Sequence, residues 1–383
     1  MPQMEFIATT LSGLEKILEK EIIELGGENT KIYRRAVSFR GGMALLYKLN
    51  FSLRTALRIL YKLKTFRLKS EEDYYKGINL IAWEDYFLNS KTIAVNAVIN
   101  TPFIKNSHYA ALKAKDAIVD HFRDKTGRRP DVDTNNPDII INVHVDNQFV
   151  DISLDSSGEP LFKRGYRVDG FEAPLNEVLA AGMIMMTGWT GESDFIDPMC
   201  GSATLSIEAA MIAKGIPAGV LRGSYAFQNW KDYDEDLYRR MVESMMVSKN
   251  FSHHIYASDI SAKAFNAAKK NIKEAMLEDI IELESIDFFD TRARDDEGLM
   301  ILNPPYGERI SQDRISEFYK RIGDHLKFNY PGHTAWILSA NLEALKYIGL
   351  KPGIKQDLVN GQLKCKYHKY ELFKGKRIDF LSK

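Results

Sequence analysis

Residues 195–204 read Phe-Ile-Asp-Pro-Met-Cys-Gly-Ser-Ala-Thr, and this stretch decides the expected fold. Its apolar start is typical of a buried strand, which breaks at Asp197-Pro198 and turns through small residues. We expect a helix over Leu205–Lys214, because apolar residues recur there at helical spacing. A turn of small residues lets a ligand approach the backbone, and the helix N-terminus favours an anionic group. A plain strand–helix turn without a ligand is the alternative.

A second motif, Asn303-Pro304-Pro305-Tyr306, directly follows the short apolar run Leu299–Leu302. The side-chain oxygen of Asn303 and the backbone carbonyl of Pro304 can each accept a hydrogen bond from a planar amino group. Two such acceptors orient the nitrogen for attack on an electrophilic methyl group. The prolines stiffen the turn, and Tyr306 offers a ring face to a flat substrate. An ordinary proline turn after a strand is the competing interpretation.

Two acidic positions lie between these motifs. Ile255–Asp259 is typical of a buried strand that ends in an acid, which can bind both ribose hydroxyls of a nucleoside cofactor. Ile281–Phe289 contains Asp287-Phe288, an acid for an adenine amino group beside an aromatic ring for the base. Each acid is weak evidence by itself, but the order of all four motifs is a strong signal.

In the order of these motifs and in their residues, the chain resembles class I S-adenosylmethionine-dependent amino-methyltransferases. It is more closely similar to bacterial 23S rRNA guanine-N2 methyltransferases that carry an RNA-binding THUMP domain. The resemblance covers the C-terminal two thirds tightly and the first third more loosely. It is carried by Arg164-Gly165-Tyr166-Arg167, Ala173-Pro174-Leu175, Glu177–Ala181, Asp197–Ser202, Asn303–Arg309 and Asn360–Cys365.

The resemblance implies S-adenosylmethionine as cofactor. It also implies that the catalytic residues, which hold the base to be methylated, are Asn303, Pro304, Pro305 and Tyr306. The cofactor-binding residues that it implies are Asp197, Pro198, Cys200, Gly201, Ser202, Ala203, Thr204, Asp259, Asp287, Phe288 and Asn303. One position departs from the family, which usually has Gly where this chain has Ala203. Alanine keeps the turn if its φ is negative, so we expect cofactor binding to survive.

The composition suits a soluble intracellular enzyme. The chain has 383 residues, of which 45% are hydrophobic and 27% charged, enough for two or three domains. We expect no membrane span, because there is no run of about 18 apolar residues, and no signal peptide. The two cysteines suggest a reducing cytoplasm, and the eight scattered histidines suggest no metal site. A monomer is the favoured state.

Basic residues are concentrated at the N-terminus, although the whole chain has a net charge of zero. Residues 1–70 contain 13 Lys and Arg against 6 Asp and Glu, an excess of seven positive charges. Such an excess favours contact with a polyanion, here RNA. A solvated helix face, with lysine stems covering apolar surface, would explain it equally well.

The expected fold class is therefore α/β. It has a Rossmann-like class I methyltransferase domain, with a doubly wound sheet and a C-terminal antiparallel hairpin, behind an α+β ferredoxin-like and THUMP RNA-binding region. We expect one basic strand over Lys31–Arg40 and a linker at Ser156–Pro160. The insertion at 215–252 could be a lid or a longer helical pair. The expected domains are residues 1–64 (ferredoxin-like), 65–155 (THUMP-like), 156–170 (linker) and 171–383 (methyltransferase).

The expected reaction is direct methyl transfer to the exocyclic N2 amine of a guanine in 23S rRNA. A strong general base is not required, because the charged product nitrogen can lose its proton to water. The same chemistry on tRNA guanine, DNA adenine N6 or protein glutamine stays open. A non-catalytic RNA-binding protein is a further alternative, against which the intact Asn303, Asp259 and Asp287 argue.

Overall fold

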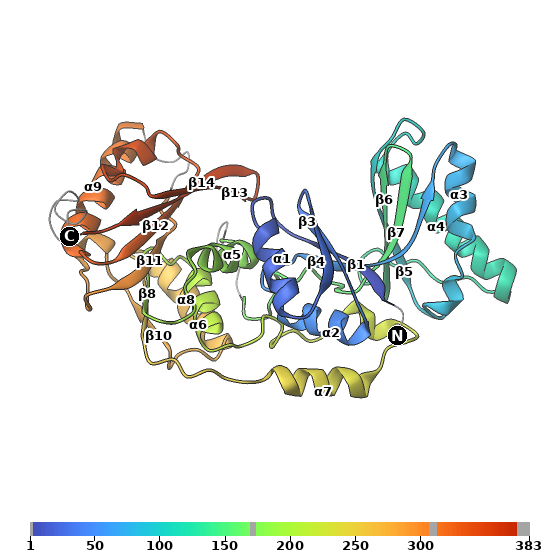
Figure 1. Ribbon diagram of the computed structural model, residues 1–383, viewed down its shortest axis with the longest axis horizontal. Coiled ribbons are helices and arrows are strands. Elements are labelled where there is room, and N and C mark those ends of the chain that lie inside the picture. Colours follow the sequence, from blue (N-terminus) through green and yellow to red (C-terminus); the bar gives the residue numbers. More distant parts are fainter. Residues whose placement is uncertain (1–2, 169–173, 306–311, 374–383) are drawn as a thin grey trace. The chain divides into compact units, whose positions relative to one another are not determined.

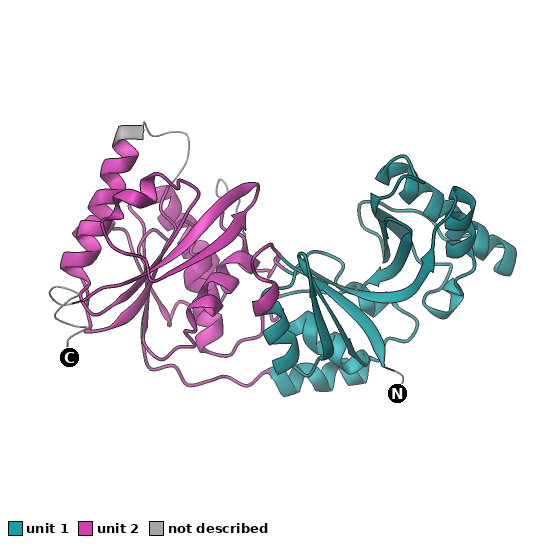
Figure 2. Ribbon diagram, turned by 45° about the horizontal axis from the view of Figure 1, so that its top comes forward, with its two compact units in different colours: residues 1–10, 18–161, 222–245 teal, residues 11–17, 162–221, 246–383 magenta. Residues whose placement is uncertain are grey.

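The computed structural model describes residues 3–168, 174–305 and 312–373 (Figure 1). The chain folds into two compact units that do not follow the order of the sequence (Figure 2). The chain passes between the two units five times. Unit 1 contains residues 1–10, 18–161 and 222–245, and unit 2 contains residues 11–17, 162–221 and 246–383.

Unit 1 is built on a seven-stranded sheet in the order β2-β3-β1-β4-β7-β6-β5. Neighbouring strands run antiparallel, except for the parallel pair β5 and β6. The strands are β1 (Met4–Thr9), β2 (Glu28–Tyr33), β3 (Ala36–Gly41), β4 (Arg58–Arg67), β5 (Ile93–Asn100), β6 (Ile139–Asp146) and β7 (Phe149–Asp155). The helical segments are α1 (Glu15–Glu24), α2 (Met43–Ser52), α3 (Glu71–Asn79), η1 (Trp83–Asp85), α4 (Ser107–Thr126), η2 (Ala226–Asn229) and α7 (Glu235–Met245).

Strand β4 lies at the centre of this sheet, between β1 and β7. The domain boundary expected after residue 64 falls inside it. Because β4 pairs on both sides, the ferredoxin-like and THUMP-like regions share one sheet. The single strand expected over Lys31–Arg40 is wrong. It is two strands, β2 and β3, joined by a turn in which Arg35 has a φ of +60°.

The linker expected at Ser156–Pro160 is packed rather than free at its start. Ser156 and Ser157 are fully buried. The Ser156 hydroxyl donates to the carbonyl of Ile59 (2.7 Å), and the Ser157 hydroxyl donates to Asn50 Oδ1 (2.7 Å). Short polar residues suggest a loop in the sequence, but here their hydroxyls satisfy buried partners in unit 1.

The insertion at 215–252 contributes its central part, residues 222–245, to unit 1. Phe227 stacks on Tyr47 of α2 with ring centroids 4.6 Å apart, and on Tyr225 at 5.2 Å. Trp230 lies 5.9 Å from Tyr61 of β4. This part of the insertion is therefore a structural element of the N-terminal sheet unit, a role that its position in the sequence does not indicate.

Unit 2 is built on a second seven-stranded sheet, in the order β10-β9-β8-β11-β12-β14-β13. The five strands from β10 to β12 run parallel, and β14 and β13 are antiparallel. The expected doubly wound sheet with a C-terminal hairpin is confirmed. The strands are β8 (Asp194–Asp197), β9 (Ile255–Ser258), β10 (Ile281–Glu284), β11 (Gly298–Leu302), β12 (Thr334–Ser339), β13 (Ile354–Asn360) and β14 (Leu363–Glu371).

Helices lie against both faces of this sheet (Figure 1). One face of β11, β12 and β14 packs on α9 in a shared apolar cluster. The strand order reverses between β8 and β11, and in open α/β sheets ligands bind at such a switch point. The helical segments are α5 (Glu177–Thr187), α6 (Thr204–Ala213), α8 (Ala262–Glu274), η3 (Phe288–Asp290), α9 (Gln312–Asn329) and η4 (Ala344–Ile348).

Candidate active site

A cleft of about 920 Å³ opens in unit 2, at the carboxyl ends of strands β8 to β11. Its size is in the range of small-molecule binding sites. The structure brings eleven of the predicted site residues together around it. These are Pro198, Cys200, Gly201, Ser202, Thr204, Asp259, Asp287, Phe288, Asn303, Pro304 and Pro305. Of the remaining three, Asp197 and Ala203 are fully buried, and Tyr306 lies outside the described residues.

Backbone hydrogen bonds hold the turn after β8 against the end of β9. The N–H of Gly201 donates to Asp259 Oδ2 (2.9 Å), and the N–H of Ser261 donates to Asp259 Oδ1 (2.9 Å). The N–H of Cys200 donates to the carbonyl of Ser258 (2.9 Å). Asp259 therefore fixes the turn, and its carboxylate keeps further lone pairs for hydroxyl groups of a ligand in the cleft.

Ala203 adopts the left-handed conformation, with φ +62° and ψ +27°. The negative φ on which the expected tolerance of alanine depended is therefore not met. The reason is geometric: Ala203 is the residue before the first turn of α6, and the chain must reverse sharply there after Gly201, whose φ is +55°. A Cβ group in this region costs about 1–2 kcal/mol. The turn keeps its shape despite that cost.

Arg167 belongs to the motif Arg164-Gly165-Tyr166-Arg167, although the sequence does not predict it as a site residue. Its Nη1 donates to Ser202 Oγ (3.2 Å) and its Nη2 donates to Thr204 Oγ1 (3.1 Å), so the guanidinium binds the turn at two residues. Its Nε donates to Glu177 Oε1 (2.8 Å). Burial raises the pKa of the Glu177 carboxyl, and the Arg167 charge opposes that rise. Nothing in the spacing of residues 167 and 202 signals this contact.

Asp197, at the end of β8, has an unsatisfied buried oxygen. The Ser206 hydroxyl donates to its Oδ2 (2.7 Å), whereas its Oδ1 has no hydrogen-bond partner among the described residues. Burial and, to a lesser extent, the carboxylate of Asp259 raise the pKa of Asp197 to about 7. A positive group in the neighbouring cleft would relieve both effects.

Asn303 follows β11 at the wall of the cleft, next to Pro304 and Pro305. Its Oδ1 is buried and accepts no hydrogen bond within the described part of the chain. A buried amide oxygen without a donor is uncommon in folded proteins and calls for a ligand group. The predicted aromatic partner at 306 lies outside the described residues.

The aromatic ring expected to cover an adenine is less accessible than the sequence suggested. Phe288 borders the cleft but is only 2% exposed, and it packs on His325 and Tyr330. Ile260, directly after Asp259, also lines the cleft and is 69% exposed. An apolar side chain so exposed at a cleft wall is a suitable surface for a base. Sequence reasoning missed it because one Ile after a strand carries no periodic signal.

Comparison with known protein families gives the site its identity. A family model described as RMKL-like, methyltransferase domain matches residues 164–369. The chain belongs to this methyltransferase family. Two further models match the N-terminal part of the chain: an RlmL ferredoxin-like domain over residues 5–60 and a THUMP domain over residues 69–155.

Curated relatives cover almost all of this methyltransferase. A Synechocystis protein named as an RNA methyltransferase is 37% identical over 96% of this chain and 97% of that protein. Proteins named Ribosomal RNA large subunit methyltransferase K/L are 35% identical in Aeromonas hydrophila and 36% identical in Methylococcus capsulatus, each over 96% of this chain. The chain spans about half the length of these two relatives, 54% and 51%.

Solved structures of similar fold cover nearly all of this chain. One methyltransferase complexed with S-adenosylhomocysteine has a TM-score of 0.89 and 27% identity, covering 98% of this chain and 100% of that chain. A Listeria monocytogenes protein described as an N6-adenine-specific DNA methylase has a TM-score of 0.87 and 26% identity, covering 97% of each chain. The cofactor of this methyltransferase is S-adenosylmethionine.

The cleft fits that cofactor. Asp197 Oδ1 is a buried acceptor without a hydrogen-bond partner in the described ranges, suited to the positive amino end of the cofactor. Asp259 and Ile260 lie together at the wall and suit a ribose and a base. Burial raises the pKa of the Cys200 thiol, which argues against a thiolate nucleophile. The described residues contain no group of three or more His, Cys, Asp or Glu side chains placed to hold a metal ion.

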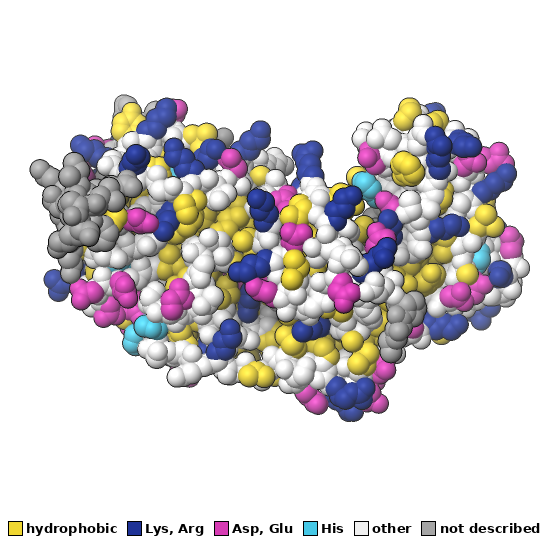
Figure 3. Space-filling view, in the orientation of Figure 1, with side chains coloured by type: hydrophobic (Ala, Val, Ile, Leu, Met, Phe, Trp, Pro, Cys, Tyr) yellow, Lys and Arg dark blue, Asp and Glu magenta, His cyan; other side chains and the backbone are white. Residues whose placement is uncertain are grey.

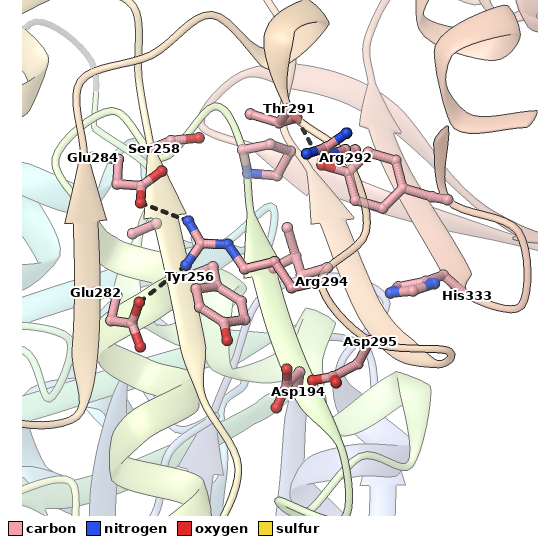
Figure 4. Close-up of a pocket in the computed structure, with 14 residues that line it drawn as sticks. Asp194, Tyr256, Ser258, Glu282, Glu284, Thr291, Arg292, Arg294, Asp295 and His333 are labelled. Atoms are coloured by element: carbon pink, nitrogen blue, oxygen red, sulfur yellow. Dashed lines mark hydrogen bonds and ion pairs between the residues drawn. The ribbon is translucent and has the colours of Figure 1, made fainter. Parts of the chain in front are cut away.

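A second hollow in unit 2 has a structural explanation. It holds only about 40 Å³ and lies beside β8, β9 and β10. Figure 4 shows the Arg294 guanidinium between the carboxylates of Glu282 (3.1 Å) and Glu284 (2.5 Å). The same guanidinium lies 4.3 Å from the ring centroid of Tyr256. The arginine in this hollow is therefore paired with two carboxylates and an aromatic ring, and we interpret the hollow as a surface ion-pair cluster rather than a ligand site.

No helix in residues 3–168, 174–305 or 312–373 is both long enough and apolar enough to span a membrane.

Proposed function

We propose that this methyltransferase transfers a methyl group from S-adenosylmethionine to the exocyclic N2 amine of a guanine in 23S rRNA. The names of the K/L relatives support the large ribosomal RNA as substrate, and the THUMP match supports RNA as partner. The proposal takes its target atom from the Asn303-Pro304-Pro305 sequence at the cleft, which suits a planar amine.

The observation that carries the proposal is the unpaired Oδ1 of Asn303. This oxygen is buried beside the cleft and has no donor among the described residues. An amine placed against it would donate one hydrogen to Asn303 and the other to the carbonyl of Pro304. With both hydrogens held, the nitrogen lone pair is directed at the cofactor rather than delocalised into the base.

The chemistry needs little more than this positioning. When bound, S-adenosylmethionine supplies an electrophilic methyl group on its sulfonium. Asn303 stabilises the positive charge that develops on the attacking nitrogen, because its oxygen becomes a better acceptor for a more acidic N–H. The nitrogen loses its surplus proton to water after transfer. Asp259 and the turn held by Arg167 keep the cofactor in place during the step.

Other acceptors remain candidates for the same site. The Listeria structural neighbour is described as an adenine-specific DNA methylase, and tRNA guanine or protein glutamine presents a similar amine. The THUMP match and the excess of seven positive charges in residues 1–70 favour RNA over DNA and protein. A protein that binds RNA without methylating it would have no use for a buried Asn303 oxygen that lacks a donor among the residues described.

The deciding experiment is nucleoside mass spectrometry of separated 23S rRNA, 16S rRNA and tRNA from a strain lacking the gene. We expect one N2-methylguanosine to disappear from 23S rRNA and to return with the wild-type gene but not with Asn303→Ala. In vitro, Asn303→Ala should lower kcat by about 10²–10³-fold, the usual effect of removing one group that stabilises a transition state.

Binding of S-adenosylhomocysteine is the control. Asn303→Ala should bind it within a few-fold of the wild type, which shows that the fold and the cofactor site are intact. Loss of a methyl group from tRNA alone would keep the chemistry and reject 23S rRNA. Unchanged RNA in the deletion strain would reject RNA methylation and direct the search to DNA adenine and protein glutamine.

We also infer that the enzyme acts as a monomer in the cytoplasm, where ribosomal RNA is modified. Light scattering after size-exclusion chromatography should give a mass near 43.7 kDa. A mass near twice that value would reject the monomer.

A further inference from the structure

The β13–β14 hairpin extends past the catalytic edge of the unit 2 sheet. Ser339 ends β12 and pairs with Lys366 of the antiparallel β14. Residues 360–365 therefore lie beyond the carboxyl end of the neighbouring strand, on the side where β8 to β11 end at the cleft. At the tip, Asn360, Gly361 and Leu363 line the cleft itself.

One face of this hairpin collects positive charge. Residues directly opposite each other in an antiparallel pair share a face, and alternate residues of one strand share it too. Lys364, Lys366 and His368 of β14 thus share a face, with Lys355 opposite His368. Burial lowers the pKa of His368, the charges of Lys355 and Lys366 lower it further, and the charge of Asp357 opposes the shift.

Little negative charge offsets these cations. Asp357, opposite Lys366, is the acid on this face of the hairpin and lies 2.6 Å from the Lys366 ammonium. Lys355 and Lys364 are exposed, and neither has an ion-pair partner within the described part of the chain. In the space-filling view, Lys and Arg side chains gather where β13 and β14 lie (Figure 3).

The charged face lies on the same side of the sheet as α9. Tyr370 and Leu372 continue the alternation that begins with Lys364, and both are buried in the apolar cluster that contains Tyr319 and Ile322 of α9. Helix α9 also supplies Arg321 to the cleft. The cations of the hairpin, the cleft and Arg321 therefore belong to one side of unit 2.

We propose that the basic face of the β13–β14 hairpin binds the phosphates of the RNA segment that flanks the target nucleotide. The proposal rests on the RNA substrate proposed above. Lysines are point charges that fit phosphates without reading sequence, so they position a strand rather than select a base. The hairpin tip at the cleft makes the bound strand continuous with the nucleotide that enters it.

A second explanation of the lysines is that they protect an edge. β13 is the last strand of the sheet, and lysines on edge strands prevent pairing with another chain. Protection against aggregation predicts a loss of solubility when the lysines are replaced, without any change in the affinity for RNA. The two explanations therefore give different results in one experiment.

The test compares two charge reversals in the full chain. The hairpin variant is Lys355→Glu with Lys364→Glu. The control is Lys269→Glu with Lys273→Glu on α8, which changes the charge equally. Both control lysines are exposed and lie in the second half of α8. Because α8 begins at the carboxyl end of β9 and runs away from it, these lysines lie far from the catalytic edge of the sheet. Total RNA from the deletion strain and labelled S-adenosylmethionine are the substrates.

We expect the hairpin variant to raise KM for RNA about tenfold or more, with kcat and the affinity for S-adenosylhomocysteine within about twofold of the wild type. The control variant should keep the KM of the wild type. Neutral replacement, Lys355→Gln with Lys364→Gln, should reduce the slope of log KM against log salt by about 1.4, the value for two phosphate contacts to a single strand.

Equal KM values for the hairpin and control variants would overturn the hairpin proposal while leaving the methylation of RNA intact. A loss of solubility with unchanged KM would establish edge protection instead. A wild-type enzyme that transfers no methyl group to any RNA fraction would count against the proposed function itself, and the hairpin proposal would fall with it.

Discussion

At the scale of single residues, Ala203 stores strain at the cofactor turn. Its φ of +62° lies in the region that favours glycine, where a Cβ group is costly. Ala203→Gly should therefore stabilise the protein by about 1 kcal/mol, since the relief outweighs the flexibility that glycine adds to the unfolded chain. Thermal unfolding of the cofactor-free protein measures this as a higher Tm.

A helical alanine gives the matched control. Ala209 is fully buried in α6, the helix that Ala203 precedes, and Ala209→Gly should lower the free energy of unfolding by about 0.5–1 kcal/mol or more. If the two substitutions change the free energy of unfolding in opposite directions, the effect at Ala203 comes from its backbone conformation. A destabilising Ala203→Gly would show that the left-handed turn carries no strain.

Replacement of Asp197 should have opposite effects on the stability of the protein and on its affinity for the cofactor. Its pKa in the folded protein is about 7, above the ordinary value of 3.8, so its contribution to stability is present below pH 4 and is lost as the pH rises through 7. Asp197→Asn removes the buried charge. At pH 8 the variant without cofactor should be more stable than the wild type by about 1–3 kcal/mol.

The same substitution should weaken the cofactor. Without the carboxylate, affinity for S-adenosylhomocysteine at pH 8 should fall about 10–100-fold, as expected for a lost charged partner. Titration calorimetry at pH 6 and pH 8 tests this: the wild type should bind more tightly at pH 8, and Asp197→Asn should bind equally at both. Equal pH dependence in both proteins would show that Asp197 does not attract the amino group.

At the scale of structural elements, the turn after β8 depends on a segment that is distant in sequence. Arg167 reaches Ser202 and Thr204 with two arms of its guanidinium, a geometry that lysine cannot reproduce. Arg167→Lys should raise the Kd for S-adenosylhomocysteine about tenfold, because two hydrogen bonds of about 1 kcal/mol each are weakened. Isothermal calorimetry gives the value directly.

Arg222→Lys is the control for this substitution. Arg222 also bonds with both arms, to the carbonyls of Pro160 (2.9 Å) and Glu159 (3.1 Å), but within unit 1. Its replacement should lower Tm without changing the Kd for S-adenosylhomocysteine. A similar loss of affinity in both variants would mean that general destabilisation, and not the turn, weakens binding.

The elements that sequence reasoning predicted are those with local signals. Strand β8 and its helix α6 follow from an apolar run, a break at Asp-Pro and helical periodicity, and the parallel strands place Asp259 and Asn303 at one edge. The turn at Arg34-Arg35 escaped, because neither Gly nor Asn marks its positive φ. Arg167 was not predicted because its partners Ser202 and Thr204 come from another segment. Ile260 was not predicted because a single Ile after a strand carries no periodic signal.

At the scale of the whole molecule, the chain returns from unit 2 to unit 1 over residues 222–245. Local pattern could not predict this, because the segment contributes aromatic residues to a core whose other members come from the first 161 residues of the chain. Tyr47 illustrates the point: its ring stacks on Phe227, and its hydroxyl accepts from the N–H of Asp234 (3.1 Å). A sequence in the methyltransferase half thus stabilises the RNA-binding half.

This arrangement predicts which unit a core mutation weakens. Phe227 is fully buried, and Phe227→Ala should cost about 3–5 kcal/mol, as is usual for large-to-small changes in a core. Because Phe227 packs on α2, hydrogen exchange should accelerate in α2 and β4 of unit 1. The strands β11 and β12 of unit 2 should keep their protection within about twofold.

Trp189→Ala is the reciprocal test. Trp189 is 3% exposed and packs on Phe195 of β8 at 5.1 Å, inside unit 2. Its loss should accelerate exchange in β8 and β11 and leave α2 protected. Faster exchange across both units in each variant would mean that the five chain passages make the molecule unfold as one cooperative body. Faster exchange only in the unit that contains the substituted residue would instead show that the two units unfold separately. Residues 222–245, which follow the first segments of unit 2 in the sequence, would then stabilise unit 1 alone.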